Sequence, residues 1–252
     1  MAITLGHNQY GKAETRVVRI FRDTEPHEIA DYNVSVALAK HFVDDVPQVS
    51  RVRIQIEAYP WDRLSHNGTP YPHAFARRGS YVRTATVTAT ADTTWIVSGV
   101  RELVVLKTTD SEFHTFYEER YTTLKPTNDR VMATSVTAQW LHTDLDTDWG
   151  TSYDRLLATL GSTFAGHHSL ALQQTMYAIG ENIIEEQPEI AEIRFSMPNK
   201  HHFLVDLSPF DVENKNEVFH ADDRPYGYIE GTVRRDDAPN PGPAAFDPGQ
   251  GW

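Results

Sequence analysis

The chain is dominated by segments in which hydrophobic and polar residues alternate, the pattern of a strand that is buried on one face. The clearest example runs from Arg51 to Glu57, where Val52, Ile54 and Ile56 fall on the same side. Further strand-like runs are rich in valine, threonine and aromatic residues: 16–21, 81–90, 95–97, 103–106, 131–140, 202–207 and 228–233. Because the second face of these runs is polar, we expect an antiparallel sheet with one face in water.

Two helices are predicted in the second half of the chain. Residues 153–164 carry apolar side chains at helical spacing, and within 172–183 such side chains recur at intervals of four, three and four. We expect Pro188 to end the second helix and Ser169 to cap its start. The order in this half is strand, strand, helix, helix, strand, strand.

The first half of the chain reads as a weaker copy of the second. Its strands are expected near residues 14–22, 28–36, 49–59 and 80–91. Only 12 residues, 37–48, lie between the second and third of these strands. Two ordinary helices need about 20 residues or more, so this gap can hold one short helix at most.

These patterns predict an α+β protein built from two tandem ββααββ units, with an antiparallel sheet and helices on one face. The units are expected at 1–91 and 92–235, and the first lacks most of its helical layer. The Pro- and Gly-rich tail, 236–252, is predicted to be disordered. Residues 65–72 are expected to form a loop.

Composition narrows the function classes. There is no cysteine among the 252 residues, which excludes disulfides, thiolate nucleophiles and cysteine-based zinc sites. The net charge of −12 argues against a nucleic-acid surface but is compatible with a local basic pocket for a small anion. No apolar run reaches the roughly 18 residues that cross a bilayer. The first residues lack the features of a signal peptide, and the last four do not match the peroxisomal targeting signal Ser-Lys-Leu. We therefore expect a cytoplasmic protein.

Four segments could carry chemistry, and each also has an ordinary structural explanation. Asn199, Lys200 and His201 lie at a turn, where they could equally be solvated hairpin residues. Arg130, with Phe113 upstream, could clamp a planar anion, although a surface arginine and a core phenylalanine are the plainer interpretation. Gln173 at a helix start could bind a heterocycle edge or simply face water.

Lys12 is the fourth candidate, because a lysine with a lowered pKa can act as a base; most lysines, however, are merely exposed. The chain has no Gly-rich phosphate loop, nucleophile elbow, HExxH motif or EF-hand loop. This pattern favours an enzyme that uses no cofactor and whose substrate performs the redox chemistry itself.

Taken together, five segments in this order resemble the urate oxidase (uricase) family: 8–12, 121–125, 129–130, 169–177 and 198–203. The resemblance implies a tandem tunnelling fold and a homotetramer with active sites at subunit interfaces. It also implies that urate, O₂ and water give 5-hydroxyisourate and hydrogen peroxide, without metal or other cofactor and without nucleic-acid or membrane partners.

The resemblance assigns substrate-binding roles to five residues. Arg130 and Gln173 would grip the edges of urate, Phe113 would stack on the purine face, and Leu124 and Leu172 would line the pocket. The backbone N–H of the last residue would be a further donor.

Three more residues take roles around the reacting atoms. Asn199 would hold O₂ or the attacking water, Lys12 matches the family's catalytic lysine, and His201 matches its relay histidine. The protein would then need only to orient urate, stabilise its dianion and relay protons.

One family segment is missing from the sequence. The family's lysine works through a threonine of a Thr-Asp pair, which should lie between Leu38 and Ala39 but does not. If the molecule lacks this segment, we predict severely reduced activity and uncovered apolar strand residues, namely Val52, Ile54 and Ile56. Two alternatives remain open: a tunnelling-fold protein that binds a purine or pterin without oxidising it, and a non-enzymatic assembly subunit.

Overall fold

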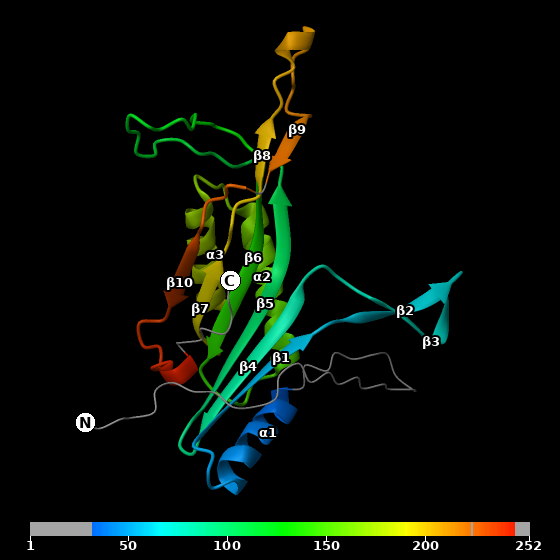
Figure 1. Ribbon diagram of the computed structural model, residues 1–252, viewed down its shortest axis with the longest axis vertical. Helices are drawn as coiled ribbons and strands as arrows, with labels where there is room; N and C mark the ends of the chain where they lie inside the picture. The colour runs from blue at the N-terminus through cyan, green and yellow to red at the C-terminus, as the bar shows by residue number, and fades with distance from the viewer. Residues whose placement is uncertain (1–31, 223, 245–252) are drawn as a thin grey trace, which may run out of the picture.

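A computed structural model describes residues 32–222 and 224–244 of the chain. Its main feature is an antiparallel sheet with the strand order β1-β4-β5-β6-β7-β10 (Figure 1). These strands are β1 (Arg51–Ala58), β4 (Val82–Thr90), β5 (Thr94–Lys107), β6 (Met132–His142), β7 (Ile190–Ser196) and β10 (Glu230–Arg234). The sheet confirms the predicted antiparallel α+β architecture.

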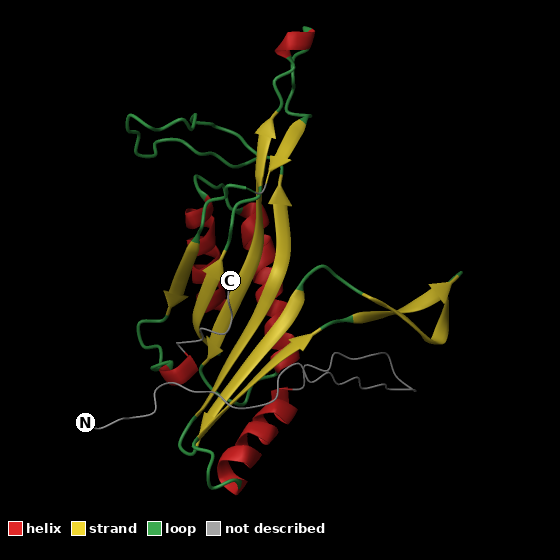
Figure 2. Cartoon of the chain, in the orientation of Figure 1, coloured by secondary structure: helices red, strands yellow, loops and turns green. Residues whose placement is uncertain are grey.

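The three α-helices in the described part of the chain cover one face of the sheet, and two of them are seen behind the strands in Figure 2. The hydrophobic core lies between the helices and the sheet. The helices are α1 (Tyr32–Asp45), α2 (Trp149–Gly166) and α3 (Leu172–Glu186). Strand register brings Ile54 opposite Val87, and Val87 opposite Ile96, on the face that α1 covers. The helices α2 and α3 cover the larger core of the second half. Within the described residues, none of the helices combines the length and hydrophobicity needed to span a membrane.

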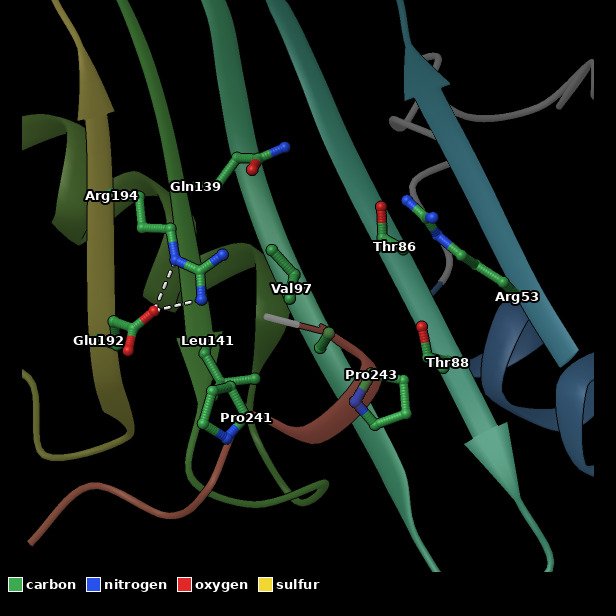
Figure 3. A pocket seen from close by; sticks show the side chains of 11 residues that line it. Arg53, Thr86, Thr88, Val97, Gln139, Leu141, Glu192, Arg194, Pro241 and Pro243 are labelled. Carbon is green, nitrogen blue, oxygen red and sulfur yellow. Dashed lines mark hydrogen bonds and ion pairs between the residues drawn. The ribbon is translucent and has the colours of Figure 1, made fainter. Parts of the chain in front are cut away.

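The opposite face of the sheet is polar, as the alternation predicts, but it does not all lie in water, since β4 is buried on both faces from Val82 to Ala89. A pocket on this polar face is lined from several strands by arginine, threonine, glutamine and glutamate side chains (Figure 3). Arg194 donates to Glu192 there, with its Nε 2.6 Å from the carboxylate oxygen. The 3₁₀ helix η2 (Gly242–Ala244) forms one wall. Residues 241–244, expected to be disordered, therefore pack on the sheet, where Pro241 and Pro243 line this pocket together with Val97 and Leu141.

Between residue 32 and the end of β4 the structure describes one helix, α1, as the short gap requires, but the strand predicted at 28–36 is wrong where the structure describes it. Residues 32–36 belong to α1, while residues 14–22 lie outside the described ranges. Ser35 and Ala39 are buried one helical turn apart, with Val36 and Val43 half-buried beside them. This spacing of three and four residues is helical, and the strand prediction overlooked it.

Having one helix where the second unit has two leaves apolar surface on that helix. Leu38 and Phe42 of α1 are 43% and 40% exposed. The strand residues Val52, Ile54 and Ile56, which we expected to be uncovered, are instead half-buried because α1 packs against them. The apolar surface left by the missing helix therefore lies on α1.

Two hairpins extend beyond the sheet (Figure 1). The first pairs β2 (Trp61–His66) with β3 (Thr69–Arg77), where the sequence predicted a loop. Its turn is Asn67-Gly68, both with positive φ, which suits a two-residue hairpin. The second pairs β8 (His201–Leu204) with β9 (Phe219–Asp222).

Both helices predicted in the second half are present, although α2 begins four residues before and ends two residues after the predicted 153–164. The helix α3 begins at Leu172 and ends at Glu186, two residues before Pro188. Its N-cap is Ala171, which has no capping side chain, so the prediction that Ser169 caps this helix is wrong. Ser169 instead donates from Oγ to the Ala171 carbonyl at 3.1 Å.

Candidate active site

Three segments that carry predicted site residues meet at one end of the sheet. They are the 108–131 loop between β5 and β6, the start of α3, and the turn between β7 and β8. Short β-bridges join Ser111 to Ser169 and Thr134 to Asn199. Ser169 Oγ donates to Met132 Sδ at 3.4 Å, and Lys200 N donates to the Ala133 carbonyl at 2.9 Å, so the three segments are close in space.

Arg130 and Phe113 form the centre of this region. The guanidinium carbon lies 5.1 Å from the centroid of the phenylalanine ring, within the range of a cation–π contact. Phe113 is fixed by two backbone hydrogen bonds with Thr127, of 2.8 and 2.9 Å, and its ring stacks on Phe116. Burial lowers the pKa of Arg130. Its Nε is buried and has no hydrogen-bond partner among the described residues.

The start of α3 supplies a second set of donors. Leu172 is buried in the core as the first residue of the helix, and Gln173 follows with an exposed side chain. The first N–H groups of a helix have no intrahelical acceptor, and the helix dipole favours an anion beside them. Behind them, Thr175 Oγ1 donates to Ser169 Oγ at 2.7 Å, which anchors the connection from α2.

Asn199 lies where β7 ends, next to a glycine that gives it room. Its backbone N–H donates to the Gly227 carbonyl at 3.4 Å. A Cβ at Gly227 would approach the Asn199 amide nitrogen to 3.1 Å, closer than most real contacts. Glycine at position 227 therefore leaves room for the side chain of Asn199.

His201, the first residue of β8, is half-buried beside the same arginine. Burial is the main cause that lowers the pKa of His201. The nearby charge of Arg130 lowers this pKa further, and Asp222 raises it. The ring stacks on Phe203 at a centroid distance of 5.5 Å. These surroundings favour a neutral imidazole, which can accept a proton.

The structure thus brings together Phe113, Arg130, Leu172, Asn199 and His201, with the backbone of Gln173 at the helix start. Leu124 lies in the same loop but is 52% exposed, so it can line a pocket only where another surface covers it. Lys12 lies outside the described residues.

A cluster of charged residues that was not predicted from the sequence lies beside these positions. His168 lies between the carboxylates of Asp110 and Glu112, and His114 contacts the second carboxylate as well. The alternation of Asp110, Glu112 and His114 was a detectable signal, because alternate residues of an extended segment share one face.

Curated relatives of this chain are uricases. The uricase of Arthrobacter globiformis is 41% identical over 278 residues, covering 93% of this chain and 91% of the relative. That of Dictyostelium discoideum is 30% identical over 92% of this chain and 98% of its own length. The first alignment spans 278 positions although this chain has only 252 residues, so the relative has internal residues without a counterpart here. This difference agrees with the missing segment.

The solved structures give the same relationship. The crystal structure of the Arthrobacter globiformis uricase is 44% identical and superposes with a TM-score of 0.81, over 86% of this chain and 74% of that one. The fold is therefore the tunnelling fold that the motifs implied. The uricase family model matches residues 33–88 and 96–230, which include every described site residue. The chain belongs to the uricase family.

Proposed function

We propose that this chain is a urate oxidase that needs no cofactor, with Arg130 and Phe113 as the centre of its urate site. The observation that carries the proposal is the buried Arg130 Nε, which has no hydrogen-bond partner in the described part of the chain although it lies beside an aromatic face. A buried donor without a partner is costly, and a planar anionic ligand would satisfy it. Membership of the uricase family supports urate as that ligand.

Each site residue contacts a different part of urate. Arg130 and Gln173 donate to opposite edges of urate, the ring of Phe113 stacks on its face, and Leu172 contributes an N–H at the start of α3. Leu124 closes the pocket from the 108–131 loop. Together these groups distinguish a flat, hydrogen-bonding anion from other small molecules.

The reaction itself needs only proton transfer and orientation from the protein. Urate gives two electrons and two protons to O₂, which becomes hydrogen peroxide, and water adds at C5 of the ring to give 5-hydroxyisourate. Asn199 holds O₂ or the water above the ring. His201 accepts a proton as a neutral imidazole, and Lys12 completes the proton relay.

We further propose that the site is completed between subunits of a homotetramer, in the cytoplasm and without nucleic-acid or membrane partners. Two observations support the interface. Leu124 is exposed in the single chain, and the β8–β9 hairpin that begins with His201 presents the exposed residues Phe203, Leu204 and Phe210. Such an apolar projection needs a partner surface to cover it.

The missing segment decides how fast the enzyme works. Without the threonine of the family's Thr-Asp pair, Lys12 lacks its hydroxyl relay, so we expect binding of urate with severely reduced turnover. The test measures loss of urate absorbance and calorimetric binding of urate and 8-azaxanthine, for the chain as it is and with the family segment inserted between Leu38 and Ala39.

Insertion should raise turnover while leaving the affinity for 8-azaxanthine similar. A turnover that already matches full-length relatives would contradict the role given to the missing segment. Binding without turnover in both forms would identify the chain as a purine-binding protein. A chain that stays monomeric and binds neither purine would be an assembly subunit instead.

A further inference from the structure

A charged contact joins the two segments that grip the substrate in the proposed site. The Nε2 of His168, in the connection between α2 and α3, lies 2.6 Å from Oε1 of Glu112 in the 108–131 loop. Its Nδ1 contacts Oδ1 of Asp110 in the same loop. One imidazole therefore spans two carboxylates that belong to a different segment.

This arrangement fixes the protonation state of the ring. An ionised carboxylate only accepts hydrogen bonds, so each ring nitrogen must carry a proton to bond to its partner. A neutral imidazole has one N–H, and its other nitrogen would face a carboxylate with a lone pair. The geometry around His168 therefore requires the imidazolium form.

The contacts of His168 with Asp110 and Glu112, which we call the His168 clamp, lie directly beside the groups that bind substrate. Glu112 precedes Phe113, and His168 lies four residues before Leu172 and five before Gln173. Between them the backbones are paired: Glu112 N donates to the Ser169 carbonyl at 2.7 Å, and Ser169 N donates to the Asp110 carbonyl at 3.2 Å. Asp110 has a φ of +62°, a conformation that needs support from its surroundings.

We propose that His168, as an imidazolium, is a positioning residue that keeps Phe113 of the loop in register with Leu172 and Gln173 at the start of α3. The inference rests on the proposed function, because it takes these residues as the urate site. When the ring loses its proton, one carboxylate loses its donor and the two segments separate more often. Substrate affinity then falls at alkaline pH while the reacting groups stay unchanged.

The charged surroundings agree with this direction. Hydrogen bonds from Asp110 and then Glu112 raise the pKa of His168 above its usual range. Lys107, which donates to the His167 carbonyl at 2.5 Å, and His114, which contacts Glu112, are the other charged or titratable groups in the cluster. The pKa of His167 is lowered by burial and by Lys107, so this neighbour loses its proton at a lower pH than His168 does.

The first measurement needs no substrate. Hydrogen exchange of peptides that contain the Glu112 and Ser169 amides is followed by mass spectrometry in the wild type, His168→Gln, His168→Arg and the control His66→Gln in the β2–β3 hairpin. We expect His168→Gln to lower protection of both peptides by about threefold, the scale of an exposed ion pair. His168→Arg should retain protection, because a guanidinium keeps its charge and donates in two directions. Unchanged protection in His168→Gln would overturn the clamp.

The second measurement is the affinity for 8-azaxanthine as a function of pH. The wild type should bind about threefold more weakly at high pH, His168→Gln should bind weakly at all pH values, and His168→Arg should stay tight throughout. A wild type and a His168→Gln variant with the same pH profile would refute positioning of the substrate. If no variant binds the purine while the exchange differences persist, the clamp stands and the urate oxidase proposal fails.

Discussion

The guanidinium carbon of Arg130 lies 5.1 Å from the centroid of the Phe113 ring, although 16 residues of loop separate the two in the chain. The loop is closed at its base, where Thr109 Oγ1 donates to Asp129 Oδ1 at 3.0 Å. Both groups are therefore positioned before any ligand arrives. A preformed arginine beside an aromatic face lowers the ordering cost of binding a flat anion.

Replacing Arg130 with lysine should weaken binding of 8-azaxanthine by about tenfold or more, because an ammonium cannot form the paired hydrogen bonds of a guanidinium. Calorimetric titration measures the loss. Arg120→Lys is a matched control, since Arg120 also lies over an aromatic ring of this loop, Tyr121, but at an exposed position. If Arg130→Lys bound 8-azaxanthine as tightly as Arg120→Lys, the assignment of Arg130 to the site would be wrong.

The alternation of residues predicts most of the sheet because the strands have an apolar face toward the helices and a more polar face opposite. Ile54 and Arg53 illustrate this on opposite faces of β1. Such a pattern depends on burial alone, which local sequence records well. The helices α2 and α3 follow for the same reason.

The strand predicted at 28–36 was taken from the repeat, although the spacing of Ser35, Ala39 and Val43 in the sequence is helical. The other errors came from contacts that local pattern does not contain. The packing of residues 241–244 on the sheet depends on a contact near Trp95, more than a hundred positions earlier. The cluster at His168 likewise depends on a pairing of Ser111 with Ser169 that only the fold creates.

Stability should fall as the pH drops from about 6.5 toward 4, because of one buried histidine. Burial lowers the pKa of His142 to about 4, and its Nε2 lies 2.6 Å from Ser98 Oγ. The unfolded chain takes up a proton below its ordinary pKa of about 6.5, whereas the folded chain does so only near 4. The stability present above pH 6.5 is therefore lost on acidification, by on the order of 3 kcal/mol.

Urea unfolding across this pH range measures the slope for the wild type, His142→Gln and the exposed control His66→Gln. The first variant should show a flatter dependence, since glutamine does not titrate, and the control should follow the wild type. A wild type with constant stability from pH 6.5 to 4 would contradict this assignment, whether or not His142→Gln folds.

A lysine at either of two neighbouring positions on α1 should affect the unfolding free energy very differently. Leu38→Lys should leave the unfolding free energy within about 0.5 kcal/mol and reduce binding of a hydrophobic dye, because the leucine is exposed. Ala39→Lys should be severely destabilising, because Ala39 is fully buried against the strands that α1 covers. Urea melts and dye fluorescence distinguish them. Similar losses at both positions would mean that the face of α1 has been assigned wrongly.

Two helical glycines should differ in the sign of a substitution by alanine. At Gly161 of α2 a Cβ meets no atom within 4 Å, so Gly161→Ala should raise the unfolding free energy by about 0.5–1 kcal/mol through helix propensity. At Gly180 of α3 a Cβ would lie 2.6 Å from Val233 Cγ2, so Gly180→Ala should cost about 1–3 kcal/mol by forcing α3 away from β10. The double change Gly180→Ala with Val233→Ala should recover part of that loss, because it removes the colliding methyl groups. Thermal and urea unfolding of the four proteins provide the comparison, and a stabilising Gly180→Ala would show that α3 does not pack on β10 as closely as described.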